Sequence, residues 1–173
     1  MNIVLIGYRC TGKTAVGLAL ARRLGKAFCD ADDYIEEKAK RSISDMVAKE
    51  GWEFFRAREK EAIRELSSFD DYIIAAGGGA VLDPENVKNL RQNGVIVLLE
   101  ATPRIILERM RSDEKTAQQR PGLTGKDPYE EIEEVLAQRM PFYTGAMDFS
   151  VDTTSKSVEQ IVDEIVRLNS YGG

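Results

Sequence analysis

The stretch from Gly7 to Thr14, Gly-Tyr-Arg-Cys-Thr-Gly-Lys-Thr, constrains the fold most, because it matches the phosphate-loop pattern G-x-x-x-x-G-K-[ST]. An apolar run, Ile3–Ile6, precedes the stretch, and a helical pattern, Ala15–Ala21, follows it. A phosphate loop needs this order of strand, loop and helix, since backbone N–H groups and the positive end of the helix surround the phosphates. The stretch predicts a nucleoside triphosphate site; an ordinary glycine-rich turn is the alternative.

The predicted contacts to the nucleotide begin inside this loop. They are Cys10, Thr11, Gly12, Lys13, Thr14 and Ala15. The Lys13 ammonium is expected to reach the terminal phosphates, and the Thr14 hydroxyl is expected to be a ligand of Mg²⁺.

Length and composition favour one domain over residues 1–173, with 43% hydrophobic and 31% charged residues. No apolar stretch approaches the roughly 20 residues that span a bilayer. The first residues also lack the basic region of a signal peptide, so we expect a cytosolic protein in which Cys10 and Cys29 are free thiols. We further expect a monomer.

The charge pattern excludes several functions. The net charge is −5, and the basic residues are spread along predicted helices, so a nucleic-acid partner finds no support. The chain has no histidine, which excludes imidazole general bases and histidine metal sites. Carboxylates, lysines and arginines must therefore carry any chemistry.

Short apolar runs alternate with helical patterns, which predicts an α/β fold with a five-stranded parallel sheet covered by helices on both faces. The predicted strands are Asn2–Gly7, Ala27–Cys29, Tyr72–Ala75, Val95–Glu100 and Asp148–Val151. The predicted helices are Lys13–Leu24, Asp32–Lys40, Ser42–Lys49, Gly51–Ser67, Pro84–Asn93, Pro103–Arg111, Pro128–Met140 and Ser157–Leu168.

The segment from Arg111 to Lys126 is polar, contains glycine and proline, and has almost no core-forming residues. A loop of this length inside a compact domain is usually functional or disordered. We expect a lid over residues 111–126 that carries Arg120; a solvated insertion is the alternative.

Asp30 and Asp32 form a D-x-D pattern at the carboxyl end of the second predicted strand, the edge where open parallel sheets bind ligands. Alternation along the strand would direct both carboxylates to the same side. We predict Mg²⁺ near Asp30 and a substrate hydroxyl near Asp32, with capping of the next helix as the alternative.

Two further patterns point to a ligand. Arg56 lies in an amphipathic helix beside aromatic residues, where it either binds an anion or follows the protein surface. Gly77, Gly78 and Gly79 follow a strand directly and permit close approach to a ligand; a turn that needs positive φ is the alternative.

The order of phosphate loop, D-x-D, F-R-x-x-E, G-G-G-A, R-P and R-x-P-x-Y resembles the shikimate kinase family, from Met1 to about Arg167. The resemblance implies a P-loop fold of the nucleoside-monophosphate-kinase type, with three α/β/α layers. It also implies that ATP phosphorylates shikimate to shikimate 3-phosphate. Another small-molecule P-loop kinase, resembling gluconate or nucleotide kinases, and a non-catalytic binding module are the alternatives.

By this resemblance, Asp32 would bind the reacting hydroxyl of shikimate and accept its proton, while Asp30 would hold Mg²⁺ through water. Arg56, backed by Glu59, and Arg139 would grip the substrate carboxylate. The glycines at 77, 78 and 79 would line the ring.

The resemblance also implies the nucleotide side of the site. Arg120 would close onto the transferring phosphate and Arg109 would lie against adenine. The stretch Asp152–Lys156, with Lys156 as a predicted contact, resembles the second adenine-side loop of the family.

Three details are specific to this chain. Cys10 stands where the family commonly has glycine, which could alter the loop or make ATP binding sensitive to thiol oxidation. Gly122 and Gly125 stand where the family usually has leucines. Trp52 is one helical turn before Arg56, so its fluorescence is expected to report shikimate binding unless it is an insensitive core residue.

Overall fold

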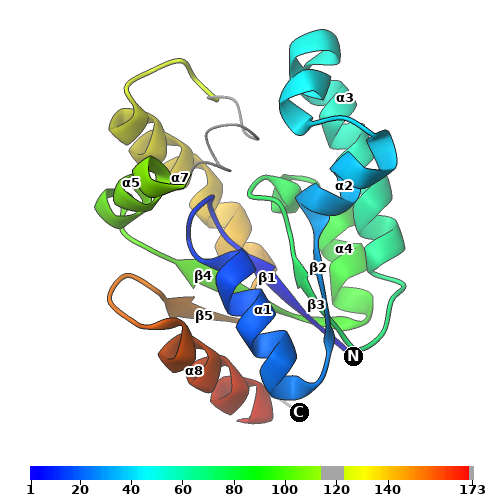
Figure 1. Cartoon of the computed structure of the whole chain (residues 1–173), viewed down its shortest axis with the longest axis vertical. Helices are drawn as coiled ribbons and strands as arrows, with labels where there is room; N and C mark the ends of the chain where they lie inside the picture. Colours follow the sequence, from blue (N-terminus) through cyan, green and yellow to red (C-terminus); the bar gives the residue numbers. More distant parts are fainter. Residues whose placement is uncertain (114–122, 172–173) are drawn as a thin grey trace.

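A five-stranded parallel sheet organises the chain in the computed structural model, which describes residues 1–113 and 123–171 (Figure 1). Its strand order is β2-β3-β1-β4-β5. The strands are β1 Asn2–Ile6, β2 Ala27–Asp30, β3 Tyr72–Ala75, β4 Gly94–Glu100 and β5 Phe149–Asp152. The predicted parallel sheet is therefore confirmed, with small shifts at the strand ends.

Helices cover both faces of this sheet. They are α1 Lys13–Leu24, α2 Ala31–Ala39, α3 Ile43–Leu66, α4 Pro84–Gln92, α5 Pro103–Ser112, α7 Pro128–Ala146 and α8 Val158–Tyr171, with a short 3₁₀ turn, η1, at Ala80–Leu82. On one face, Leu20 of α1 and Ile165 of α8 pack against Leu5. On the other, Ile63 of α3, Leu90 of α4 and Tyr143 of α7 share a core with strand residues. The three predicted layers are present.

The strand order places the loops for ligand binding. After β1 the chain runs through β2 and β3 on one side, and it then crosses to β4 and β5 on the other. In open parallel sheets, ligands bind beyond the carboxyl ends of the strands at such a reversal. Figure 1 shows α2 and part of α3 rising on one side of this edge, with α5 and part of α7 on the other.

The predicted break between the helices Ser42–Lys49 and Gly51–Ser67 is confirmed: α3 has a kink at Gly51, whose φ of 84° and ψ of 171° are not helical. One other helix differs from the sequence prediction. Helix α7 continues through Pro141 to Ala146, beyond the predicted end at Met140. Burial of Tyr143 and Ala146 in the core outweighs the hydrogen bond that proline removes.

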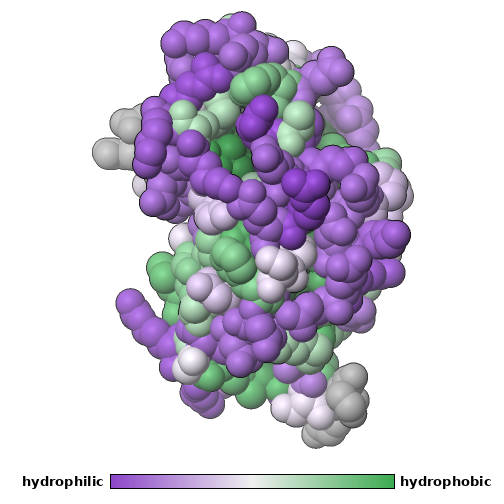
Figure 2. All heavy atoms as spheres, turned by 90° about the vertical axis from the view of Figure 1, so that its right-hand side faces the viewer, coloured by the Kyte–Doolittle hydropathy of each residue, from purple (hydrophilic) through white to green (hydrophobic). Residues whose placement is uncertain are grey.

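The surface carries both hydrophilic and hydrophobic residues. Figure 2 shows one face on which hydrophilic residues are widespread and hydrophobic residues form smaller groups among them. Within residues 1–113 and 123–171, no helix has both the length and the apolar character to cross a membrane. Cys10 and Cys29 are free thiols, as predicted.

Candidate active site

The phosphate loop connects β1 to α1 and is held in shape by its own carbonyl groups. Lys13 Nζ donates to the Gly7 and Tyr8 carbonyls at 2.8 Å each, and Thr11 Oγ1 donates to the Tyr8 carbonyl at 2.9 Å. Gly12 has φ 103° and Cys10 has φ 59°. Cys10 thus adopts the left-handed conformation in which glycine is usually found, so its side chain does not prevent the loop from forming.

The outer side of the loop is held by residues from two other elements. Arg109 of α5 donates from Nη1 to the Cys10 carbonyl at 3.1 Å. Thr153, just after β5, has its Oγ1 2.9 Å from the Thr11 carbonyl. Arg109, predicted to lie against adenine, therefore also contacts the loop, while the predicted contact Lys156 pairs with Glu164 on α8.

Thr14 and Asp30 meet beside the loop, as the predicted Mg²⁺ site requires. Thr14 Oγ1 donates to Asp30 Oδ2 at 3.0 Å, and Asp30 Oδ1 accepts from the Asp32 backbone N–H at 3.0 Å, which caps α2. Asp30 therefore fits both the predicted role and its capping alternative. Among residues 1–113 and 123–171, no cluster of three histidine, cysteine or acidic side chains is found.

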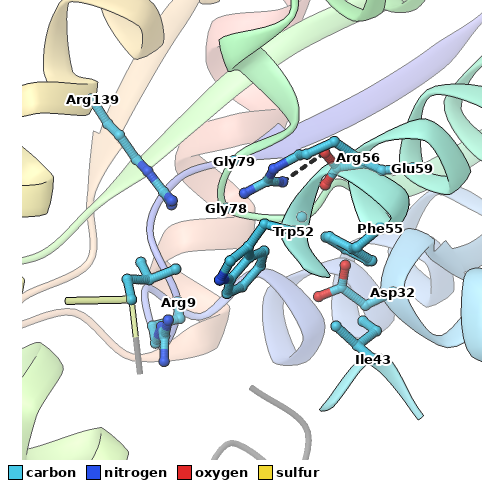
Figure 3. Close-up of a pocket in the computed structure, with 12 residues that line it drawn as sticks. Arg9, Asp32, Ile43, Trp52, Phe55, Arg56, Glu59, Gly78, Gly79 and Arg139 are labelled. Carbon is cyan, nitrogen blue, oxygen red and sulfur yellow. Dashed lines mark hydrogen bonds and ion pairs between the residues drawn. The ribbon is translucent and has the colours of Figure 1, made fainter. Parts of the chain in front are cut away.

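A charged pocket lies next to the loop (Figure 3). Its lining is Arg9, Asp32, Ile43, Trp52, Phe55, Arg56, Glu59, Gly77, Gly78, Gly79, Leu123 and Arg139. Arg139 from α7 and Arg56 from α3 enter from opposite sides, and Asp32 lies below them in the view of Figure 3. The structure thus brings the predicted acceptor residues into one cavity.

Asp32 reaches this pocket from a helix and not from a strand. It lies in the first turn of α2 and is only 5% exposed. The predicted alternation along a strand is therefore wrong for Asp32, because the chain turns into α2 immediately after Asp30. The helix turn still leaves its carboxylate at the pocket wall.

Glu59 holds Arg56 in the pocket. Arg56 Nη1 donates to Glu59 Oε1 at 2.7 Å, and Glu59 is 1% exposed. Burial raises the pKa of Glu59 above its ordinary value, against the opposing effect of Arg56. Within the described part of the chain, Glu59 Oε2 is buried without a hydrogen-bond partner. Arg56 is therefore fixed by a buried carboxylate and does not simply follow the surface.

The three glycines make space for these side chains. A methyl group on Gly77 would lie 2.8 Å from both Asp32 Oδ1 and Glu59 Oε2, and one on Gly79 would lie 2.3 Å from Arg56 Nη2. None of the three has a positive φ, so the alternative of a turn that needs positive φ is wrong. The absence of side chains lets two acidic groups and a guanidinium approach the backbone.

The sequence did not predict three residues that line or support the pocket. Arg9, which is 7% exposed, occupies a variable position of the loop pattern and so gave no signal. The Tyr143 hydroxyl, in the R-x-P-x-Y motif, donates to the Gly78 carbonyl at 2.6 Å. Glu131 Oε2 accepts from the Leu123 backbone N–H at 3.1 Å and thereby anchors a pocket residue.

Part of the predicted lid lies outside the described residues. These are residues 114–122, including Arg120 and Gly122. At the two described ends, Arg111 belongs to α5 and Leu123 lines the pocket.

Comparisons with known proteins give one consistent family. The family model described as shikimate kinase matches residues 9–169. A shikimate kinase from Syntrophus aciditrophicus is 49% identical, and the match covers 96% of this chain and 89% of the relative. A solved structure of shikimate kinase from Acinetobacter baumannii in complex with shikimate has a TM-score of 0.92 at 32% identity, covering 99% of this chain and 93% of that chain.

The rival kinase class is more distant. A gluconokinase from Sinorhizobium meliloti has a TM-score of 0.53 at 18% identity, covering 98% of this chain and 95% of that chain. At this identity the likeness is one of fold alone. The nucleoside-monophosphate-kinase type of P-loop fold is thereby confirmed.

Proposed function

This chain belongs to the shikimate kinase family, and from that membership we propose how its residues divide the work of the reaction. The chain is an enzyme that transfers a phosphoryl group from ATP to shikimate, giving ADP and shikimate 3-phosphate. One observation supports the residue assignments: three arginines and two buried acids share a pocket beside the phosphate loop.

Arg56 and Arg139 bind the carboxylate of shikimate in this proposal. A guanidinium group matches a carboxylate with two parallel N–H donors, which an ammonium group cannot offer. The two arginines face each other across the pocket, and Glu59 fixes the first of them. Shikimate then lies with its ring against Gly77, Gly78 and Gly79.

Asp32 orients the reacting hydroxyl and accepts its proton. The hydroxyl oxygen forms a bond to the γ-phosphorus as the bond from that phosphorus to the bridging oxygen of ADP breaks. Phosphoryl transfer depends chiefly on alignment and charge neutralisation, so a weak carboxylate base is sufficient. Lys13 leaves the loop carbonyls and neutralises charge on the phosphates, while Arg120 does so from the lid.

We further propose that Thr14 and Asp30 hold a Mg²⁺ ion. Thr14 and Asp30 supply hard oxygen atoms that already lie together, as Mg²⁺ requires. When bound, the ion neutralises charge on the phosphate oxygens. Arg109 contacts adenine and Lys156 lies nearby, on the adenine side. A monomer without nucleic-acid or membrane partners, located in the cytosol, stays a prediction.

A coupled assay of ADP formation tests the proposal. The assay contains ATP and Mg²⁺ with shikimate, gluconate or a nucleoside monophosphate as the acceptor. Of these three acceptors, we expect turnover only with shikimate. Robust turnover of another acceptor would favour the rival kinases, and binding of both ligands without turnover would favour a non-catalytic module.

A further inference from the structure

We propose that the Thr153 hydroxyl, together with Arg109, sets the direction in which two backbone N–H groups of the phosphate loop point. Thr153 is thus a positioning residue that acts on the phosphates through the loop. The inference rests on the proposed function only in that the loop binds the phosphates of ATP.

The Thr153 hydroxyl lies between two backbone carbonyl oxygens. Thr153 is 0% exposed, and its Oγ1 lies 2.9 Å from both the Thr11 and the Glu100 carbonyl oxygens. The Glu100 carbonyl already accepts from the Thr153 backbone N–H at 2.8 Å. If the hydroxyl is removed, the Glu100 carbonyl keeps the Thr153 N–H as a donor, whereas the Thr11 carbonyl loses the donor that Thr153 supplies.

Arg109 completes the arrangement from α5. Its Nη1 lies 3.1 Å from the Cys10 carbonyl and 3.1 Å from Thr153 Oγ1, and its Nη2 donates to the Thr153 carbonyl at 2.8 Å. The guanidinium therefore binds the loop and fixes Thr153 at the same time. Two consecutive loop carbonyls, those of Cys10 and Thr11, are thus held by side chains from α5 and from the segment after β5.

Peptide geometry turns these contacts into control of the phosphate site. In a planar trans peptide the C=O and the following N–H point in opposite directions. Holding the Cys10 carbonyl toward Arg109 therefore aims the Thr11 N–H away from Arg109. Holding the Thr11 carbonyl toward Thr153 likewise aims the Gly12 N–H away from Thr153. Successive N–H groups that converge in this way form the anion-binding nest of a phosphate loop.

The backbone conformation of this loop makes the two carbonyl contacts important. Cys10 has φ 59° and Gly12 has φ 103°, so a residue with a side chain sits in the left-handed region beside a glycine. Single peptide units in such a segment can rotate when a carbonyl loses its donor, because other conformations are less strained. Loss of the hydroxyl should therefore turn the Gly12 N–H away from a bound phosphate.

Calorimetry with ADP and AMP tests this role. In P-loop proteins the loop N–H groups contact the α- and β-phosphates, so the added affinity of ADP over AMP reports on the loop. Thr153→Val keeps the shape of the side chain and removes the hydroxyl. We expect it to weaken ADP binding about 10-fold and AMP binding less than about 3-fold, while Thr153→Ser restores both.

The control is Thr154→Val, in the same loop. The Thr154 hydroxyl accepts from the Thr102 backbone N–H at 3.2 Å, so its loss should leave the ratio of ADP to AMP affinity unchanged. If Thr153→Val does not fold, Thr153→Cys, a weaker donor, is compared with Thr153→Ser in the same way.

Equal losses for ADP and AMP, or no loss at all, would overturn the proposal, as would failure of Thr153→Ser to restore binding. Neither titration contains shikimate. A chain that binds ADP normally but fails to phosphorylate shikimate would therefore refute the proposed function and leave this inference standing.

Discussion

Arg139 reaches the pocket from α7 and faces Arg56, which allows a direct test of the carboxylate clamp (Figure 3). Removing one member of a desolvated charge pair costs about 2–5 kcal/mol, so Arg139→Ala should weaken shikimate binding at least about 30-fold. ADP affinity should stay the same. Titration calorimetry measures both constants.

Arg104→Ala is the control for this substitution, because Arg104 has a side chain 83% exposed and a surface partner, Glu108. We expect no change in shikimate affinity for that variant. Normal shikimate affinity in Arg139→Ala would instead remove Arg139 from the clamp.

Glu59 gives the pocket a dependence on pH. Burial raises its pKa above the ordinary value of 4.5, so its contribution to stability is fully present below about pH 4.5 and is lost as the pH rises through the folded-state pKa. The free energy of unfolding of the natural chain, minus that of Glu59→Gln, should therefore fall as the pH rises above about 4.5. Urea unfolding at several pH values measures this difference.

Glu61→Gln serves as the matched control, since Glu61 is on the same helix, 47% exposed, and pairs with Arg58 at the surface. The difference in free energy of unfolding between the natural chain and Glu61→Gln should change little with pH. A difference for Glu59→Gln that rises with pH would mean that Arg56 lowers the pKa of Glu59 more than burial raises it.

At the scale of elements, the bend in α3 brings a fluorescent probe to the pocket. Trp52 follows the bend at Gly51, lines the pocket, and has Arg56 Cζ 5.5 Å from the centre of its ring. Shikimate binding should therefore change the environment of the indole and its emission. We expect a saturable change in fluorescence on titration with shikimate.

The same titration of Arg139→Ala is the control. A signal from binding should move to much higher shikimate concentration in that variant, whereas a signal from added solute should not move. A flat titration of the natural chain at saturating shikimate would contradict the proposed position of the substrate.

The strands were easier to predict from the sequence than the helix ends. Apolar runs at strand length and the loop pattern identified the sheet and the donor site, because both depend on local residue order. The break at Gly51 was also predicted, but the end of α7 was missed, since burial of Tyr143 beyond Pro141 is a tertiary effect. The role of Thr153 was also out of reach, because a single threonine carries no pattern.

At the scale of the molecule, one helix connects regions that pack separately. Residues of α2 and α3, among them Ile35, Met46 and Phe55, form a small core apart from the two cores on the sheet. The later half of α3 continues from Phe55 to Ile63 and Leu66, which belong to a sheet core. The part of α3 after Gly51 thus takes part in both the small core and a sheet core.

This connection predicts that the chain unfolds as one unit. Trp52 fluorescence reports on the α2 and α3 region, and far-ultraviolet circular dichroism reports on the whole chain. Phe55 of the small core and Ile63 of the sheet core lie on the same uninterrupted part of α3. The two signals should therefore give the same urea midpoint. Shikimate at about 100 times its dissociation constant should raise the free energy of unfolding by about 2.7 kcal/mol in both signals. A lower urea midpoint for Trp52 than for circular dichroism, with the gap removed by shikimate, would show instead that the acceptor region unfolds on its own.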